Sequence, residues 1–186
     1  HYCLGASYLL SLGEVGFPKA LDEFHRELKL NPNDYFSLSQ LGYIALSQHK
    51  LPEAEEYLKR AAALDARNPD NQLLLGQVYM QLNRPADAEQ AFRQAIALTT
   101  DLSRNHYQVQ RAHYLLGRLL VQSGHTDEAK EQMRISADLL RQNMVRDQAR
   151  LKGAPMREAA SISPLQHPPD PAPVDARAKR ELEAFT

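Results

Sequence analysis

The sequence predicts an all-α protein, a right-handed α-solenoid of four helix-turn-helix repeats with a long closing helix and a proline-rich C-terminal tail. Three observations support this prediction. A leucine-glycine motif recurs at a fixed interval along most of the chain. Apolar residues within each interval follow the spacing of helices. Five of the eleven prolines crowd between Pro164 and Pro173, which marks the end of the regular part.

The repeat is most regular in the middle of the chain. Leu41-Gly42 recurs as Leu75-Gly76, 34 residues later, and Ala54 recurs as Ala88 at the same shift. Leu4-Gly5 opens an earlier unit and Leu116-Gly117 a later one. One helical hairpin cannot bury its apolar stripe alone, so neighbouring units must stack. The glycine and alanine positions are expected to let helices approach closely, and the larger residues Phe24, Leu58, Phe92 and Met133 to fill the space between units.

The spacing also predicts the boundaries of the domains. The array is expected over residues 1–153, with repeats at about 1–34, 35–68, 69–102 and 103–140 and a closing helix to residue 152. About three extra residues lie in the turn of the first unit, and the extra stretch 100–108 predicts that the first helix of unit four starts early. The chain starts inside a helix, so preceding residues are expected. A proline-rich linker over 154–173 precedes a short amphipathic helix or tail over 174–186.

The repeat resembles the tetratricopeptide repeat family over roughly residues 1–140. The best match is Leu75-Gly76, Tyr79, Ala88, Phe92 and Ala95. The early tryptophan of the family is replaced in the four units by His1, Leu38, Gln72 and His113.

Composition argues against several other classes of protein. Lysine plus arginine is 22 and aspartate plus glutamate is 23, so the net charge of −1 gives no reason to expect nucleic acid or an anionic membrane surface as partner. No apolar run is long enough to span a membrane. The sequence assigns no compartment.

No enzyme, cofactor or metal site is expected either, because the chain lacks phosphate-binding, nucleophile-elbow and zinc-protease motifs. Cys3 is interpreted as a small packing residue. His106 and His113 could share a helix face but have no acidic or cysteine partner at the spacing of metal ligands.

The resemblance implies that the first helix of each unit lines a concave groove for a peptide or helix of a partner protein. The residues that flank each leucine-glycine then become the candidate site: Tyr2, Phe36, Ser39, Tyr43, Asp70, Leu73, Gln77, Arg111, Tyr114, Arg118 and Gln122. Tyrosine and arginine dominate binding energy at many interfaces. The alternative is that these are ordinary surface and packing residues. The lysines and asparagines by which one subclass grips chaperone tails are absent.

The leading hypothesis is therefore an adaptor or scaffold module. Two alternatives stay open, namely a structural subunit of a permanent or homo-oligomeric assembly and a regulatory domain of a larger enzyme. Val174, Ala178, Leu182 and Phe185 lie at spacings of four, four and three, so they share one helix face. We expect this segment to dock on protein, either in the groove of its own chain or on a neighbouring copy.

Overall fold

The computed structural model describes residues 1–100 and 102–151, with side chains for all of these except 102–105. The linker and the amphipathic tail expected from the sequence lie outside this part. The described residues form α-helices and no strand: α1 (Tyr2–Leu12), α2 (Phe17–Leu30), α3 (Tyr35–Ser47), α4 (Leu51–Leu64), α5 (Pro69–Gln81), α6 (Pro85–Leu98), α7 (Leu102–Gln122) and α8 (Thr126–Leu151). The chain divides into two compact units, His1–Asn143 and Met144–Thr186, so the division falls within α8.

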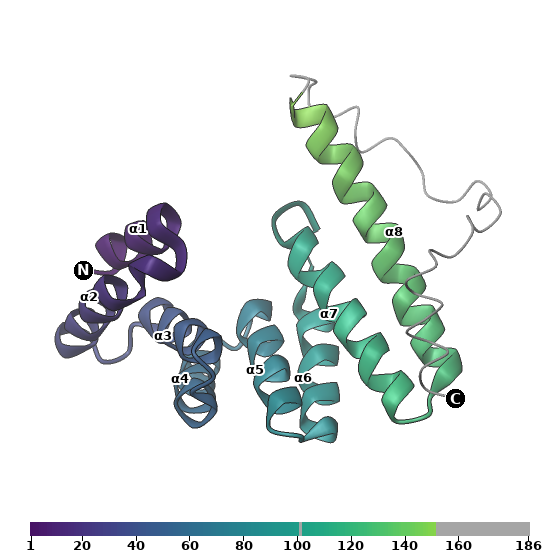
Figure 1. Ribbon diagram of the computed structural model, residues 1–186, viewed down its shortest axis with the longest axis horizontal. Coiled ribbons are helices and arrows are strands. Elements are labelled where there is room, and N and C mark those ends of the chain that lie inside the picture. Colours follow the sequence, from purple (N-terminus) through teal and green to yellow (C-terminus); the bar gives the residue numbers. More distant parts are fainter. Residues whose placement is uncertain (101, 152–186) are drawn as a thin grey trace. The chain divides into compact units, whose positions relative to one another are not determined.

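The helices of the first unit follow one another as hairpins, which confirms the predicted solenoid of helix-turn-helix repeats (Figure 1). α1 packs on α2, α3 on α4 and α5 on α6, and each second helix also packs on the next first helix. In the fourth hairpin, Gln110 of α7 donates a hydrogen bond of 2.8 Å to the Ser136 hydroxyl of α8.

Two irregularities of the repeat have a structural counterpart. The extra residues of the first turn form a short 3-10 helix, η1 (Gly13–Gly16), between α1 and α2. α7 has 21 residues, whereas α5 has 13, so the insertion before unit four lengthens a first helix. None of the described helices is long and apolar enough to cross a membrane.

The helices α3, α5 and α7 end in the same way. The second residue after each helix adopts a left-handed conformation, with φ of 58° at His49, 55° at Asn83 and 81° at Gly124. The next amide then donates back to a carbonyl of the last turn, as Lys50 does to Ala45 and Arg84 to Tyr79, both at 2.9 Å. This Schellman-type ending satisfies carbonyls that a helix terminus leaves free and turns the chain into the second helix.

The leucine-glycine motif is explained by the packing inside each hairpin. A Cβ atom on Gly42 would lie 2.5 Å from the Leu58 side chain, and one on Gly76 would lie 2.4 Å from the Phe92 ring. Only glycine permits so close an approach. Ala54 and Ala88 are fully buried, as the sequence predicts.

The buried apolar residues form two clusters. The smaller cluster contains Phe17, Phe24 and Leu41, and the larger one extends from Ala45 to Ala129. The two clusters meet within α3, since Ile44 belongs to the first and Ala45 to the second. Each cluster is held by contacts between neighbouring repeats, as expected of a stacked array.

First and second helices differ in how closely they approach their counterparts in the next repeat. The backbones of α1 and α3, of α3 and α5, and of α5 and α7 come into contact. Those of α2 and α4, and of α4 and α6, do not. The face lined by first helices is therefore the narrower, inner face of the first unit.

Candidate functional site

The first-helix face carries a group of aromatic side chains on α1 and α3. The ring of Tyr2 lies 5.4 Å from that of Phe36, which in turn lies 4.0 Å from Tyr35. Tyr43 lies two helical turns further along α3, with its ring edge-on to Phe17 at 6.3 Å. Phe36 and Tyr43 remain 44% and 43% exposed, so this end of the face offers aromatic surface to a ligand.

The middle of the face is polar, and some of its polar atoms are buried from solvent. The Ser39 hydroxyl on α3 donates a hydrogen bond of 2.6 Å to Oδ1 of Asn71 on α5. Asn71 is fully buried, and its Nδ2 bonds to no described residue. Oδ1 of the neighbouring Asp70 is also buried and bonds to none of the residues that the structure describes, and burial raises the pKa of Asp70 above its ordinary value. Unsatisfied buried groups are rare in native structures, and their presence here singles out the junction of α3 and α5.

The other end of the face, on α7, is basic. Arg111 donates a hydrogen bond of 2.7 Å to Oε1 of Gln77 on α5. The guanidinium of Arg118 lies 5.9 Å from the ring centre of Tyr114, one turn away. Arg111, Tyr114 and Arg118 are all exposed, as is Gln122 at the end of the helix. Two exposed arginines, seven residues apart on one helix, can therefore each bind a carboxylate of a ligand.

The structure brings together several of the predicted site residues, but not all of them. Tyr2 meets Phe36, Gln77 meets Arg111, and Tyr114 meets Arg118. Leu73 is only 5% exposed and packs in the larger apolar cluster, so it offers a ligand almost no surface. Its position in the repeat is equivalent to that of Ser39, but an apolar side chain at that position turns into the core.

One polar residue of the face, Asn71, is absent from the predicted site, because that site was chosen from other positions around each leucine-glycine motif. Asn71 lies four residues before Leu75, and Ser37 occupies the equivalent position before Leu41. Both are buried and polar, and Ser37 Oγ likewise bonds to no described residue. The usable signal was a polar residue at a position whose helical phase predicts burial.

The histidines and the cysteine considered for metal binding or catalysis do not come together in the described part of the chain. Residues 1–100 and 102–151 contain no group of three or more histidine, cysteine, aspartate or glutamate side chains that could hold a metal ion. His113 is buried instead against α8, where its Nδ1 lies 2.7 Å from Oε1 of Gln132. Cys3 is exposed, so its interpretation as a packing residue was wrong.

Fold and repeat motif together define a helical repeat array. Tetratricopeptide repeat models match residues 5–71, 45–108 and 110–134. The chain belongs to the tetratricopeptide repeat family, as the sequence predicted. Its repeats support a role as a protein-interaction scaffold in general terms, and members of this family are typically interaction modules rather than enzymes.

Solved structures show the same fold. A crystal structure of MamA aligns with a TM-score of 0.61 and 23% identity, over 84% of this chain and 88% of that chain. The crystal structure of YrrB, described as a TPR protein with an unusual peptide-binding site, aligns with a TM-score of 0.59 and 21% identity, over 84% of this chain and 77% of that chain. A search of the curated proteins gave no significant match.

Proposed function

We propose that the first-helix face binds a segment of another protein, in an extended or helical form, and that the chain works as an adaptor. The observation that carries the proposal is the pair of exposed aromatic side chains Phe36 and Tyr43 on the inner face, with the partly buried Tyr2 beside Phe36. Contiguous exposed aromatic surface is costly to leave in water and is enriched where proteins bind one another. The peptide-binding site named for YrrB, which has the same fold, is in keeping with this use of the array.

The chemistry of the face specifies the segment further. An apolar side chain of the ligand would pack on Phe36 and Tyr43, while a carboxylate would bind Arg111 or Arg118. Between them, the half-buried carboxyl group of Asp70 disfavours a second carboxylate. The proposed ligand is therefore a segment with an apolar anchor at one end and an acidic residue at the other.

Affinity capture from an extract of the source cells tests this proposal. The wild-type chain, Tyr43→Ala and Arg118→Glu are compared, with Arg67→Glu as control because Arg67 lies in the exposed turn between α4 and α5. We expect the proteins retained by wild type to be retained by the control and lost from both groove variants. Thermal melting of each variant shows whether it is folded.

Retention of the same proteins by the two folded groove variants would contradict the proposal. A mass in solution that corresponds to a fixed oligomer at all concentrations would favour the permanent assembly instead.

The C-terminal segment 174–186 is a second candidate ligand for the same groove, because its apolar stripe ends in Phe185 and it contains acidic residues. A chain that stops at residue 163 separates the two cases. If the tail occupies the groove, truncation strengthens the binding of a captured partner, and Tyr43→Ala removes that gain. An unchanged affinity and an unchanged mass would exclude docking of the tail.

A further inference from the structure

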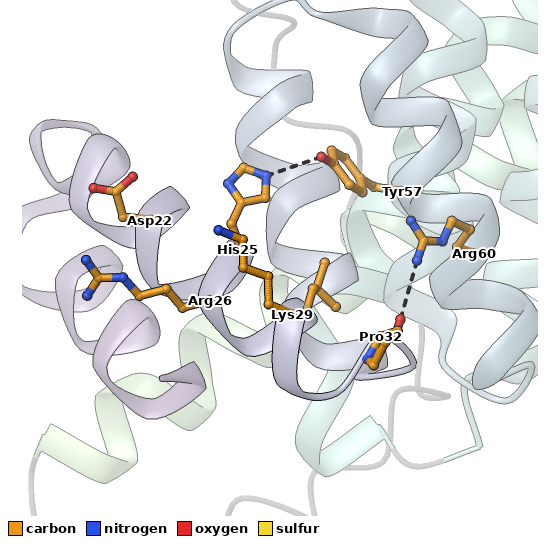
Figure 2. Close-up of a pocket in the computed structure, with 8 residues that line it drawn as sticks. Asp22, His25, Arg26, Lys29, Pro32, Tyr57 and Arg60 are labelled. Atoms are coloured by element: carbon orange, nitrogen blue, oxygen red, sulfur yellow. Dashed lines mark hydrogen bonds between the residues drawn. The ribbon is translucent and has the colours of Figure 1, made fainter.

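A cleft lies between the second helices of repeats one and two. It has a volume of about 700 Å³ and is lined by α2, α4 and the turn after α2 (Figure 2). The cleft exists because the backbones of α2 and α4 do not touch, although each packs on α3. Side chains rather than backbone therefore shape this surface.

The floor of the cleft is apolar and aromatic. Leu28 and Tyr57 are partly buried and pack against the smaller apolar cluster. The Tyr57 hydroxyl lies 3.3 Å from Nε2 of His25, which joins α2 to α4 across the cleft (Figure 2). Arg60 donates a hydrogen bond of 3.3 Å to the carbonyl oxygen of Pro32, so the turn after α2 is tied to α4. These two contacts link the walls of the cleft.

The rim of the cleft is cationic. The charge of Arg26 is offset by a salt bridge of 2.8 Å to Glu23. Lys29 and Arg60 make no salt bridge with any residue in the described part of the chain, and Asp22 is the one carboxylate among the residues that line the cleft. Burial raises the pKa of Tyr57, and Glu53 and Glu56 of α4 lie near enough to raise it further, so they limit the positive charge on that wall. Two exposed cations that make no salt bridge, set beside an apolar floor, attract anionic groups.

We propose that this outer cleft binds a short acidic segment of a partner protein, with carboxylates on Lys29 and Arg60 and an apolar side chain on Leu28 and Tyr57. The apolar floor favours a peptide over a bare anion, because an anion uses only the rim. The site is separate from the first-helix groove, so the array could hold two partner segments at once. The two sites also differ in the source of their positive charge. In the outer cleft it comes from Lys29 and Arg60 on second helices, whereas in the first-helix groove it comes from the arginines of α7.

Binding is measured by calorimetry with the full chain and three acetylated, amidated pentapeptides, Glu-Glu-X-Glu-Glu with X as Leu, Phe or Tyr. The matched peptides with Gln in place of Glu serve as controls for the charge. We expect at least one acidic peptide to bind, its Gln counterpart not to bind, and the affinity to fall as salt rises. Lys29→Gln and Arg60→Gln should each weaken binding roughly tenfold.

Lys50→Gln is the control variant, because Lys50 is an exposed lysine at the opposite end of α4 from Arg60 and should bind as wild type does. Since Arg60→Gln also removes the bond to Pro32, nuclear magnetic resonance of the wild type supplies a measurement that needs no variant. Acidic peptide should shift the ring signals of Tyr57 and His25 and leave those of Tyr43 unchanged.

Several results would overturn the proposal. These are no binding of any acidic peptide, equal binding of the Gln peptides, or unchanged affinity in both cleft variants. Complete competition by inorganic phosphate at the same concentration as the peptide would show a simple anion site. Self-association of the chain that disappears in Lys29→Gln would show that a second copy occupies the cleft.

Discussion

Single side chains decide how closely the helices of a hairpin can pack. Ala88 on α6 is fully buried, and Phe92 one turn later fills the space against Gly76 of α5. Ala54, Leu58 and Gly42 make the same arrangement one repeat earlier. Substitutions at these positions should therefore change stability far more than substitutions at exposed positions of the same helix.

Ala88→Asp is expected to lower the free energy of unfolding by several kcal/mol, roughly 3 or more, because it buries an unpaired carboxylate in a tight helix contact. Ala86→Asp is the matched control. Ala86 is exposed in the first turn of α6, where a negative charge is favourable. Urea unfolding followed by circular dichroism compares the two. Equal stability of Ala88→Asp and wild type would contradict the packing described for α6.

The buried histidine on α7 should make stability depend on pH. Burial lowers the pKa of His113 below its ordinary 6.5, and the hydrogen bond with Gln132 offsets this only in part. The folded state then binds fewer protons than the unfolded state. The free energy of unfolding should therefore fall as pH decreases through about 6.5 toward the lower folded-state pKa.

Denaturant unfolding at about pH 7.5 and about pH 5.5 measures this dependence. His113→Gln cannot be protonated, so it should lose less stability on acidification than wild type does. His125→Gln, which replaces an exposed ring in the turn before α8, should keep the dependence of wild type. A dependence that is the same in His113→Gln and wild type would show that other groups cause it.

At the scale of elements, turns and helices were predictable from sequence, whereas the exposure of individual residues was not. Asn83-Arg84-Pro85 and Ser123-Gly124-His125 locate turns because their residues tolerate left-handed backbone or start a helix. Leu73 and Ser39 share a repeat position, yet only the leucine turns into the core. Cys3 lies exposed, and Asn71 is buried. Such differences depend on contacts between repeats, which a pattern within one repeat does not contain.

The turn between α3 and α4 contains a conformation that its residue does not favour. His49 has a φ of 58°, which Asn83 and Gly124 adopt at the equivalent positions with less steric cost. His49→Gly should therefore raise the free energy of unfolding by up to about 1 kcal/mol, net of the entropy that glycine adds to the unfolded chain. This substitution also removes the hydrogen bond between His49 and Gln81, which is 3.0 Å long. Because that bond is exposed to solvent, its loss should cost little stability.

Urea unfolding measures this gain against Gln48→Gly. Gln48 precedes His49 with a φ of −88°, so glycine relieves no strain there and should only destabilise. If His49→Gly is destabilised as much as Gln48→Gly, the left-handed residue carries no strain.

Across the whole first unit, the two apolar clusters imply that cooperativity is limited. The smaller cluster depends on Phe17, Phe24 and Leu41, whereas the larger one is shared by the helices from α3 to α8. The only buried residue of α1 is Gly5. In a stacked array each repeat is stabilised by its neighbours, so the end with the smaller core should open first.

Amide hydrogen exchange resolved along the chain tests this order of opening. In wild type, the amides of α1 and α2 should exchange faster than those of α5 and α6. Phe24→Ala removes the largest fully buried side chain of the smaller cluster, so it should speed exchange in α1 and α2 and leave α5 and α6 nearly unchanged. Phe92→Ala makes the same change in the larger cluster. It should speed exchange in α5 and α6, and also in α3, α4 and α7, because these helices share that core. A uniform increase of exchange over all helices in Phe24→Ala would mean that the unit unfolds as a single cooperative body, whatever the separation of its clusters.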